Sequence, residues 1–344
     1  MLFKKRSELF GLDIGSSSVK LVELQKTGSG YQLVNFGLVS LSQEAIIDGA
    51  LMDSQAVIDA IKALLGETRT RTKNVATSVS GHSVIIKKIS VPLMTDEDLE
   101  ESIQWEAEQY IPFNISDVNL DFQVLRRPEG EGSQMDVLLV AVKQEMIDDY
   151  VSVITDVSSF SIQNMYELNY SVVEDEVVAI LNIGANIMNI NVIKNGATIF
   201  TRDVSMGGNL FNEEIQKQLN MSYGDSESLK LGGQISQEVN ASEVAEIISS
   251  TSQVLITEAE RSLEFFSAAS GDEKMHKIAL CGGCAKLAGL AGSIEDQIGI
   301  PVEIANPFKE IEYNENDFNS DYLMEVGPMA GVGVGLAMRR IGDK

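Results

Sequence analysis

The feature of this sequence that most constrains its fold is a three-stranded unit that occurs twice. The first copy begins with an apolar run from Phe10, which ends in Asp13-Ile14-Gly15 and is followed by small hydroxyl residues. An alternating run then continues to Leu24, and a second turn leads into a third strand pattern at 31–36. Short apolar or alternating runs separated by glycine turns predict antiparallel strands.

The second copy of this unit repeats the plan in the second half of the chain. An apolar run at 178–183 is followed by an alternating run at 187–193, an Asn195-Gly196 hairpin turn and a third strand pattern. Asp13-Ile14-Gly15 corresponds to Asn182-Ile183-Gly184 in this alignment. Two copies of one supersecondary unit predict two similar domains that face each other across a cleft.

The glycine turns of both copies indicate a phosphate site in that cleft. A turn at the end of a hairpin exposes backbone N–H groups, which are the donors that hold phosphate oxygens. A third glycine site follows a short apolar strand at 277–280, where residues 281–287 read as a turn that enters a helix. The three sites together predict a nucleotide between the two halves.

Composition excludes several classes of partner. The 344 residues carry 26 Lys and Arg against 51 Asp and Glu, a net charge of −25, which repels nucleic acid and anionic lipid but attracts basic peptides. The basic start, Met1 to Arg6, has no apolar run behind it that resembles a signal peptide. No stretch reaches the roughly 18–20 apolar residues that span a bilayer. We expect a soluble, cytoplasmic protein without direct membrane insertion.

Cysteine and histidine are scarce. Cys281 and Cys284 are the two cysteines, and His82 and His276 are far apart in sequence, so a disulfide framework, a zinc site or a histidine-based triad has little material. The Cys-Gly-Gly-Cys spacing also satisfies a redox or half-zinc motif, which we keep as the less favoured alternative.

The three glycine sites, in this order, resemble the phosphate 1, phosphate 2 and adenosine motifs of the superfamily of actin, sugar kinases and chaperone ATPases. A narrower resemblance, at 13–24, 105–113, 118–125, 207–209 and 260–266, is to the PilM family of type IV pilus assembly proteins and covers nearly the whole chain. It implies an α/β protein of actin-like ATPase fold, with two RNase H-like lobes and an FtsA-type inserted subdomain in the first lobe.

The resemblance also implies subdomain boundaries. We expect subdomain 1A at 1–82 and 158–178, the inserted subdomain 1C at 83–157, subdomain 2A at 179–205 and 275–344, and a helical subdomain 2B at 206–274. Within 1C, Thr95 and Asp98 form a capping-box pattern that predicts the start of a helix. A second helix is expected around Met146, Tyr150 and Ile154.

ATP and Mg²⁺ are the cofactors that the resemblance implies. Asp13 is expected to hold Mg²⁺, directly or through water, and hydroxyls and ammonium groups to meet the phosphates. Asp13 capping its own turn, Lys20 as a solvated strand residue, and Glu214 and Arg261 in surface salt bridges are the alternatives. The positions matched to the nucleotide site are Asp13, Gly15, Ser16, Ser17, Ser18, Lys20, Asn182, Gly184, Ala185, Asn186, Gly207, Gly208, Asn209, Glu214, Arg261, Gly282, Gly283 and Lys286.

Asn182 departs from the acidic residue that the superfamily usually carries at the second phosphate turn. An amide lacks the charge that helps to fix Mg²⁺ or to orient an attacking water. We therefore expect a nucleotide-binding assembly protein with weak or absent hydrolysis, and we assign no catalytic residue.

The resemblance implies that the partner is the N-terminal cytoplasmic peptide of a PilN-like inner-membrane protein, alongside other pilus assembly proteins that serve pilus formation and twitching motility. This peptide would hold the protein at the inner membrane. Trp105, Tyr110, Pro112 and Phe113 would line its groove, or would instead be core residues of the inserted subdomain. An FtsA-like division protein is the nearest alternative, which we disfavour because the sequence ends at 339–344 without a linker and an amphipathic tail for membrane attachment. A sugar-kinase-type phosphotransferase is the other alternative, although no motif for its base is found.

Overall fold

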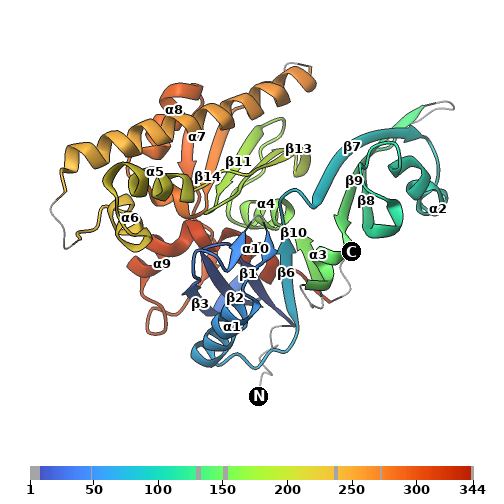
Figure 1. Cartoon of the computed structure of the whole chain (residues 1–344). Helices are drawn as coiled ribbons and strands as arrows, with labels where there is room; N and C mark the ends of the chain where they lie inside the picture. Colours follow the sequence, from blue (N-terminus) through green and yellow to red (C-terminus); the bar gives the residue numbers. More distant parts are fainter. Residues whose placement is uncertain are drawn as a thin grey trace.

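Two β-sheets of related topology form the framework of the protein (Figure 1). The structure is a computed structural model that describes residues 8–47, 49–128, 133–149, 154–235, 239–271 and 273–341. The first sheet has six strands, in the order β10 (Ile154–Val157), β6 (Val75–Val79), β1 (Phe10–Ile14), β2 (Ser18–Lys26), β3 (Tyr31–Ser40) and β16 (Ile311–Glu312). The second has five, in the order β13 (Ala197–Val204), β12 (Met188–Lys194), β11 (Val177–Ile183), β14 (Lys277–Cys281) and β15 (Val302–Ile304).

The duplication that the sequence predicts is present in both sheets. The antiparallel meander β1-β2-β3 corresponds to β11-β12-β13. In the first sheet, β1 also pairs in parallel with β6, and β6 pairs in parallel with β10. In the second sheet, β11 pairs in parallel with β14, and β14 pairs in parallel with β15. The predicted two-lobed α/β fold with a duplicated sheet is confirmed.

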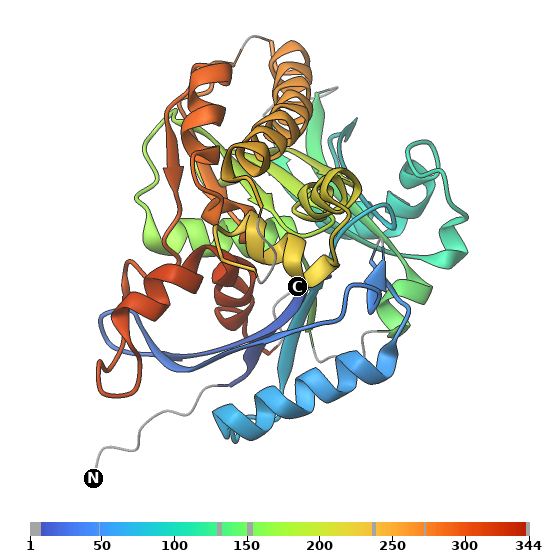
Figure 2. The same cartoon turned by 60° about the vertical axis from the view of Figure 1, so that its left-hand side comes forward.

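Strand β11, in the middle of the second sheet, is almost entirely apolar because both faces of that sheet are covered. All residues of β11 except Asn182 are buried, and its Val-Val-Ala-Ile-Leu run reads as a strand without alternation. On the outer faces, α1 (Ser54–Thr68) covers the first sheet, while α5 (Asn209–Leu219), α7 (Ala241–Ala269) and α8 (Leu290–Ile298) cover the second. Figure 2 shows α1 and α7 on opposite outer sides of the molecule.

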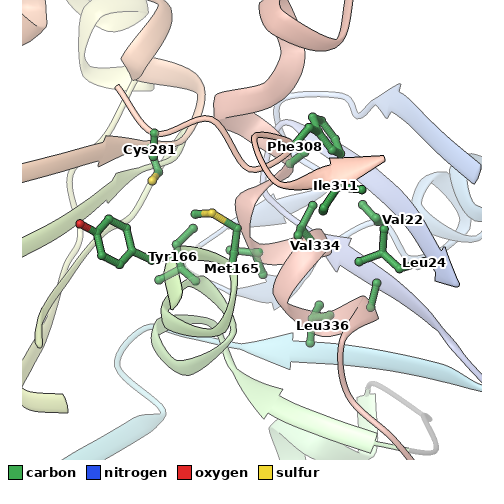
Figure 3. Close-up of a cluster of buried hydrophobic side chains, with 14 of the residues drawn as sticks. Val22, Leu24, Met165, Tyr166, Cys281, Phe308, Ile311, Val334 and Leu336 are labelled. Carbon is green, nitrogen blue, oxygen red and sulfur yellow. The ribbon is translucent and has the colours of Figure 1, made fainter. Parts of the chain in front are cut away.

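Between the two sheets lie α4 (Ser158–Asn169) and α10 (Gly331–Ala337), which pack against each other. The buried cluster around them takes side chains from both lobes, including Val22 and Leu24 of the first sheet and Cys281 of the second (Figure 3). Because one apolar core is shared by both lobes, the two sheets and the two helices form a single packed unit.

Glycine makes this helix pair possible. A Cβ on Gly335 of α10 would lie 1.7 Å from the backbone oxygen of Ser161 in α4, and one on Gly11 of β1 would lie 2.3 Å from the oxygen of Gly333. The backbones therefore approach too closely for any side chain at these positions.

A third, three-stranded sheet projects to one side of the first lobe (Figure 1). Its order is β7 (Val84–Pro92), β9 (Gln134–Lys143) and β8 (Val118–Arg126), and α2 (Asp96–Ala107) packs on it. The predicted capping box is confirmed, since the Asp98 N–H donates to Thr95 Oγ1 (3.1 Å) and the Thr95 N–H to the Asp98 carboxylate (3.4 Å). This unit is the inserted subdomain of the first lobe.

The structure differs from the predicted boundaries in two places. Strand β10 pairs with β6 of the first sheet, so the prediction of a helix through Ile154 was wrong: α3 spans Gln144–Asp149, and Tyr150 lies outside the described residues. Strand β16 and α10, which we placed in subdomain 2A, pack on the first sheet instead. Periodicity within a segment identifies a helix or a strand but not the sheet that it joins.

Smaller elements complete the description. They are β4 (Ile46–Ile47), β5 (Ala50–Leu51), α6 (Tyr223–Lys230), α9 (Ser320–Val326), and the 3₁₀ turns at Ile115–Asp117, Gly283–Lys286 and Gly327–Ala330. In the part of the chain that the structure describes, we find no helix with the length and apolar character needed to cross a membrane.

Candidate nucleotide site

A cavity of about 420 Å³ lies where the two meanders and the third glycine site meet. Its walls come from both lobes: the turn after β1, the turn after β11, the start of α5, part of α6 and the 3₁₀ turn after β14. The residues of the predicted nucleotide site that line it are Asp13, Gly15, Ser16, Ser17, Ser18, Lys20, Asn182, Gly184, Ala185, Asn186, Gly208, Asn209, Gly282, Gly283 and Lys286.

The first turn presents an ion pair to the cavity. Asp13 and Lys20 lie directly opposite each other on β1 and β2, and Lys20 Nζ is 3.2 Å from Asp13 Oδ2. Lys20 is only 8% exposed as a residue, which excludes the alternative of a solvated strand lysine. Two charges held together out of bulk water lose solvation, which polar ligand groups in the cavity can replace.

Ser18 supplies the second notable feature of this turn. It is 2% exposed, and its Oγ has no hydrogen-bond partner among the residues that the structure describes. A buried hydroxyl without a partner loses roughly 1–3 kcal/mol relative to a bonded one. Because Ser18 lines the cavity, a ligand oxygen or a water there could complete its bonding.

The second turn has the same backbone plan with different side chains. The Gly184 N–H donates to the Ile187 carbonyl at 2.9 Å, as the Gly15 N–H donates to the Ser18 carbonyl at 3.1 Å. Opposite each other on β11 and β12 stand two amides, and Asn182 Nδ2 donates to Asn189 Oδ1 at 3.0 Å. Where the first turn has an ion pair, the second has a neutral amide pair.

The start of α5 is fixed to the second turn. The N–H groups of Gly208 and Asn209 donate to the carbonyls of Gly184 and Ala185, at 2.9 and 2.8 Å. A Cβ on Gly207 would lie 2.4 Å from the Gly184 oxygen, so this glycine supports the turn without lining the cavity.

In the third turn, two adjacent glycines have different surroundings. Gly282 has φ +84°, and a Cβ there would lie 2.3 Å from the Ile183 oxygen. A Cβ on Gly283 would meet no atom of the described residues within 4 Å, although Gly283 lines the cavity. Gly282 is therefore required by the fold, whereas the open space at Gly283 is space that a ligand could use.

The structure brings to the cavity three polar side chains of α6 that no sequence pattern indicated: Tyr223, Glu227 and Lys230. The Lys230 side chain is 8% exposed and forms an ion pair with Glu227, and Tyr223 Oη donates to Asn209 Oδ1 at 2.9 Å. Burial raises the pKa of Tyr223, which keeps its phenol protonated as a donor.

Glu214 and Arg261, which the resemblance placed in the nucleotide site, do not line the cavity. Glu214 accepts from Gln218 and Lys217 on its own helix, and these contacts lower its pKa. The Arg261 side chain is 69% exposed and lies near Glu258. Both residues lie on helix faces and form side-chain pairs at the surface. In the candidate site, side chains of α6 take the places that we expected for them.

The two cysteines are buried, at 1% and 3% exposure, and burial raises the pKa of each thiol to about 12. At pH 8 roughly one thiol in 10⁴ would be ionised, against about a quarter for a free thiol.

We expect iodoacetamide at pH 8 to leave native Cys281 and Cys284 unmodified and to alkylate both in guanidinium chloride, as read by mass spectrometry. Comparable rates in both states would favour the redox alternative instead. Among the described residues, no group of three or more potential metal ligands is found.

The predicted partner-binding residues lie on the inserted subdomain. Trp105 of α2 is 73% exposed and Pro112 is exposed, while Tyr110 and Phe113 are half-buried against the core of this subdomain. Lys143 Nζ lies 4.8 Å from the centre of the Phe113 ring. Trp105 is thus a surface residue, and Tyr110 and Phe113 contribute partly to the core.

Comparison with known structures places the chain in a fold class. The ethanolamine utilization protein EutJ from Carboxydothermus hydrogenoformans is similar at 13% identity, with 96% of this chain and 88% of that chain covered and a TM-score of 0.54. MreB5 of Spiroplasma citri bound to AMPPNP is similar at 14% identity, with 95% and 94% covered and a TM-score of 0.50. The chain therefore has the actin-like fold.

The particular family follows from two closer matches. The model of the family described as type IV pilus assembly protein PilM matches residues 11–341. A solved structure described as the PilM-PilN type IV pilus biogenesis complex is similar at 31% identity, with 98% of this chain and 100% of that chain covered and a TM-score of 0.86. The chain belongs to the PilM family of type IV pilus assembly proteins.

Proposed function

We propose that this chain binds ATP in the cavity between its lobes and, in that state, holds the N-terminal cytoplasmic tail of a PilN-like inner-membrane protein. The cavity carries the nucleotide part of the proposal. Three glycine turns from two lobes converge on it. One holds the Ser18 hydroxyl, for which the described residues offer no hydrogen-bond partner, and another has open space at Gly283. MreB5, of the same fold, is a protein described as bound to AMPPNP, which supports this assignment.

Asp13 and Lys20 would meet the charged end of the nucleotide. Asp13 would offer one carboxylate to Mg²⁺, directly or through water, and Lys20 would face phosphate oxygens. The second turn offers amides in place of a second acid, so the water-orienting and metal-fixing groups are fewer. Bound ATP would accordingly act as a brace between the lobes with little turnover.

The inserted subdomain would supply the peptide surface. The solved relative is described as a PilM-PilN complex, and it matches this chain over its full length. Exposed Trp105 lies one helical turn from exposed Glu101 on α2, a pairing of an aromatic anchor with a negative charge. With a net charge of −25, the chain suits a basic peptide, whose membrane anchor would keep the protein at the inner membrane.

The test is capture of the protein by an immobilised synthetic peptide of the cytoplasmic tail, with and without ATP and Mg²⁺. We expect ATP to increase capture, and Trp105→Ala to weaken binding about tenfold or more, because exposed aromatic anchors dominate peptide interfaces. Phe265→Ala is the matched control, since Phe265 is 61% exposed on the second lobe. Equal loss in both variants, or no capture of the wild type, would refute the peptide assignment.

A further inference from the structure

Three polar side chains form a row across the second sheet, starting at the cavity. Asn182, Asn189 and Asp203 are directly paired in the registers of β11, β12 and β13. Asn182 Nδ2 donates to Asn189 Oδ1 (3.0 Å), and Asn189 Nδ2 donates to Asp203 Oδ1 (2.7 Å). The other carboxylate oxygen, Asp203 Oδ2, accepts from the Gly81 N–H at 2.6 Å. The row is thus a continuous chain of hydrogen bonds.

The Asp203 carboxylate at the end of this row determines which group donates and which accepts in each hydrogen bond of the row. An ionised carboxylate only accepts hydrogen bonds, so Asn189 must present its NH₂ to Asp203 and its oxygen to Asn182. Asn182 must then present an N–H to Asn189. A carboxylate at position 182 would have no hydrogen to donate to Asn189. Asn189 could not donate to it instead, because its single NH₂ group already points toward Asp203.

The chain also crosses from one lobe to the other. Asp203 is on β13 of the second lobe, whereas buried Gly81 belongs to the first lobe and lies between β6 and β7, where the chain enters the inserted subdomain. Gly81 has φ +95°, a conformation that favours glycine. A neighbouring bond joins the same two segments, between Ser205 Oγ and His82 Nε2 at 2.7 Å.

We propose that Asp203 is a positioning residue for the cavity: it fixes the direction of the Asn189 and Asn182 amides and connects them to the first-lobe backbone at Gly81, where the chain enters the inserted subdomain. Asp203 does not line the cavity, so it acts through the two amides. The consequence for a bound nucleotide depends on the proposed function, but the hydrogen-bond direction does not.

Two substitutions test the direction. In Asn182→Asp, Asn189 can donate either to the new carboxylate or to Asp203, so one bond is lost and two acceptors face each other. In Asp203→Asn, the new amide can accept from Gly81 and donate to Asn189, which lets the two side-chain hydrogen bonds reverse. Combined, N182D/D203N keeps all three hydrogen bonds: the two side-chain bonds are reversed, and the Gly81 N–H still donates to residue 203. The number of carboxylates is unchanged.

The experiment is a double-mutant cycle on the full chain without nucleotide, read by thermal unfolding. We expect N182D to lower Tm by about 2 °C in the Asp203 background, the loss typical of one part-buried hydrogen bond in a chain of this length. In the D203N background the same substitution should lower Tm by about 0.5 °C or less. Equal penalties in the two backgrounds would overturn the proposal.

Two controls separate the direction of hydrogen bonding from other causes. Ser205→Ala removes the His82 bond at the same junction but leaves the amides in place, so the N182D penalty should stay at its full value there. Repulsion between two carboxylates would weaken on raising NaCl from 0.1 to 1 M, because the screening length falls from about 10 to 3 Å. A coupling that disappears at 1 M NaCl would refute the proposal in favour of repulsion.

ATP binding is measured on the same four proteins, so that the two proposals fail separately. Strong coupling in a wild type that binds no ATP would leave the role of Asp203 intact and contradict the proposed function. ATP binding without coupling would contradict the role of Asp203 and leave the proposed function intact. If ATP binding and coupling are both observed, N182D/D203N is also the variant that has a carboxylate at position 182 and keeps the row of hydrogen bonds. We expect it to hydrolyse ATP faster than N182D alone.

Discussion

Gly335→Ala should destabilise the protein by about 3 kcal/mol or more, a large effect for the addition of one methyl group. The added Cβ would fall 1.7 Å from the backbone oxygen of Ser161, and that atom cannot rotate away as a side chain can. α4 and α10 would have to separate, and both pack between the two sheets in the core shared by the lobes. The free energy of unfolding in urea, followed by circular dichroism, measures the loss.

Gly66→Ala is the matched control for this experiment. Gly66 is an exposed residue of α1, and a Cβ there would meet no atom within 4 Å. Alanine is a better helix former, so this variant should be as stable as the wild type or more stable by about 0.5–1 kcal/mol. Two variants of equal stability would show that α4 and α10 are not in such close contact.

ATP with Mg²⁺ should raise the Tm of the wild type and leave that of Gly283→Val unchanged. A ligand confined to the folded state stabilises it by about 2.7 kcal/mol at a hundredfold excess over Kd. Gly283 lines the cavity and faces open space, so a valine side chain there would extend into the cavity. It should block the ligand and leave the fold intact. Differential scanning fluorimetry with and without ATP makes the comparison.

The neighbouring glycines show why Gly283 is the informative position. Valine at Gly282 would contact the Ile183 backbone and should destabilise the protein itself, and a Cβ on Gly15 would meet Lys20 Nζ at 3.1 Å and displace it. Gly28→Val is the control, because it has open surroundings in the turn after β2. A shift retained in Gly283→Val would contradict the third turn as part of the site, and no shift in the wild type would contradict the whole cavity.

The sequence was sufficient for the fold because the repeat is local. Each meander can be recognised from turns and strands that are consecutive in the chain, and two such units imply two sheets. The glycine turns of the site were found for the same reason. The capping box at Thr95 and Asp98 is also a signal contained in four residues.

The remaining site residues depend on how distant segments pack. Tyr223, Glu227 and Lys230 belong to a short polar helix whose sequence resembles any exposed helix, and only its position beside α5 brings them to the cavity. Asn189 is different, because it occupies the place in the second hairpin that Lys20 occupies in the first. The aligned repeat therefore contains a signal for Asn189.

The return of the C-terminal segment to the first sheet has a consequence for how the protein forms during synthesis. The second sheet and its outer helices lie within residues 177–304 and can assemble as soon as that stretch is complete. The first sheet begins with β1 but lacks β16 and α10 until more than 330 residues have been made. Contacts so far apart in the chain form slowly because closing a long loop costs entropy. The half that leaves the ribosome first is therefore the half that is finished last.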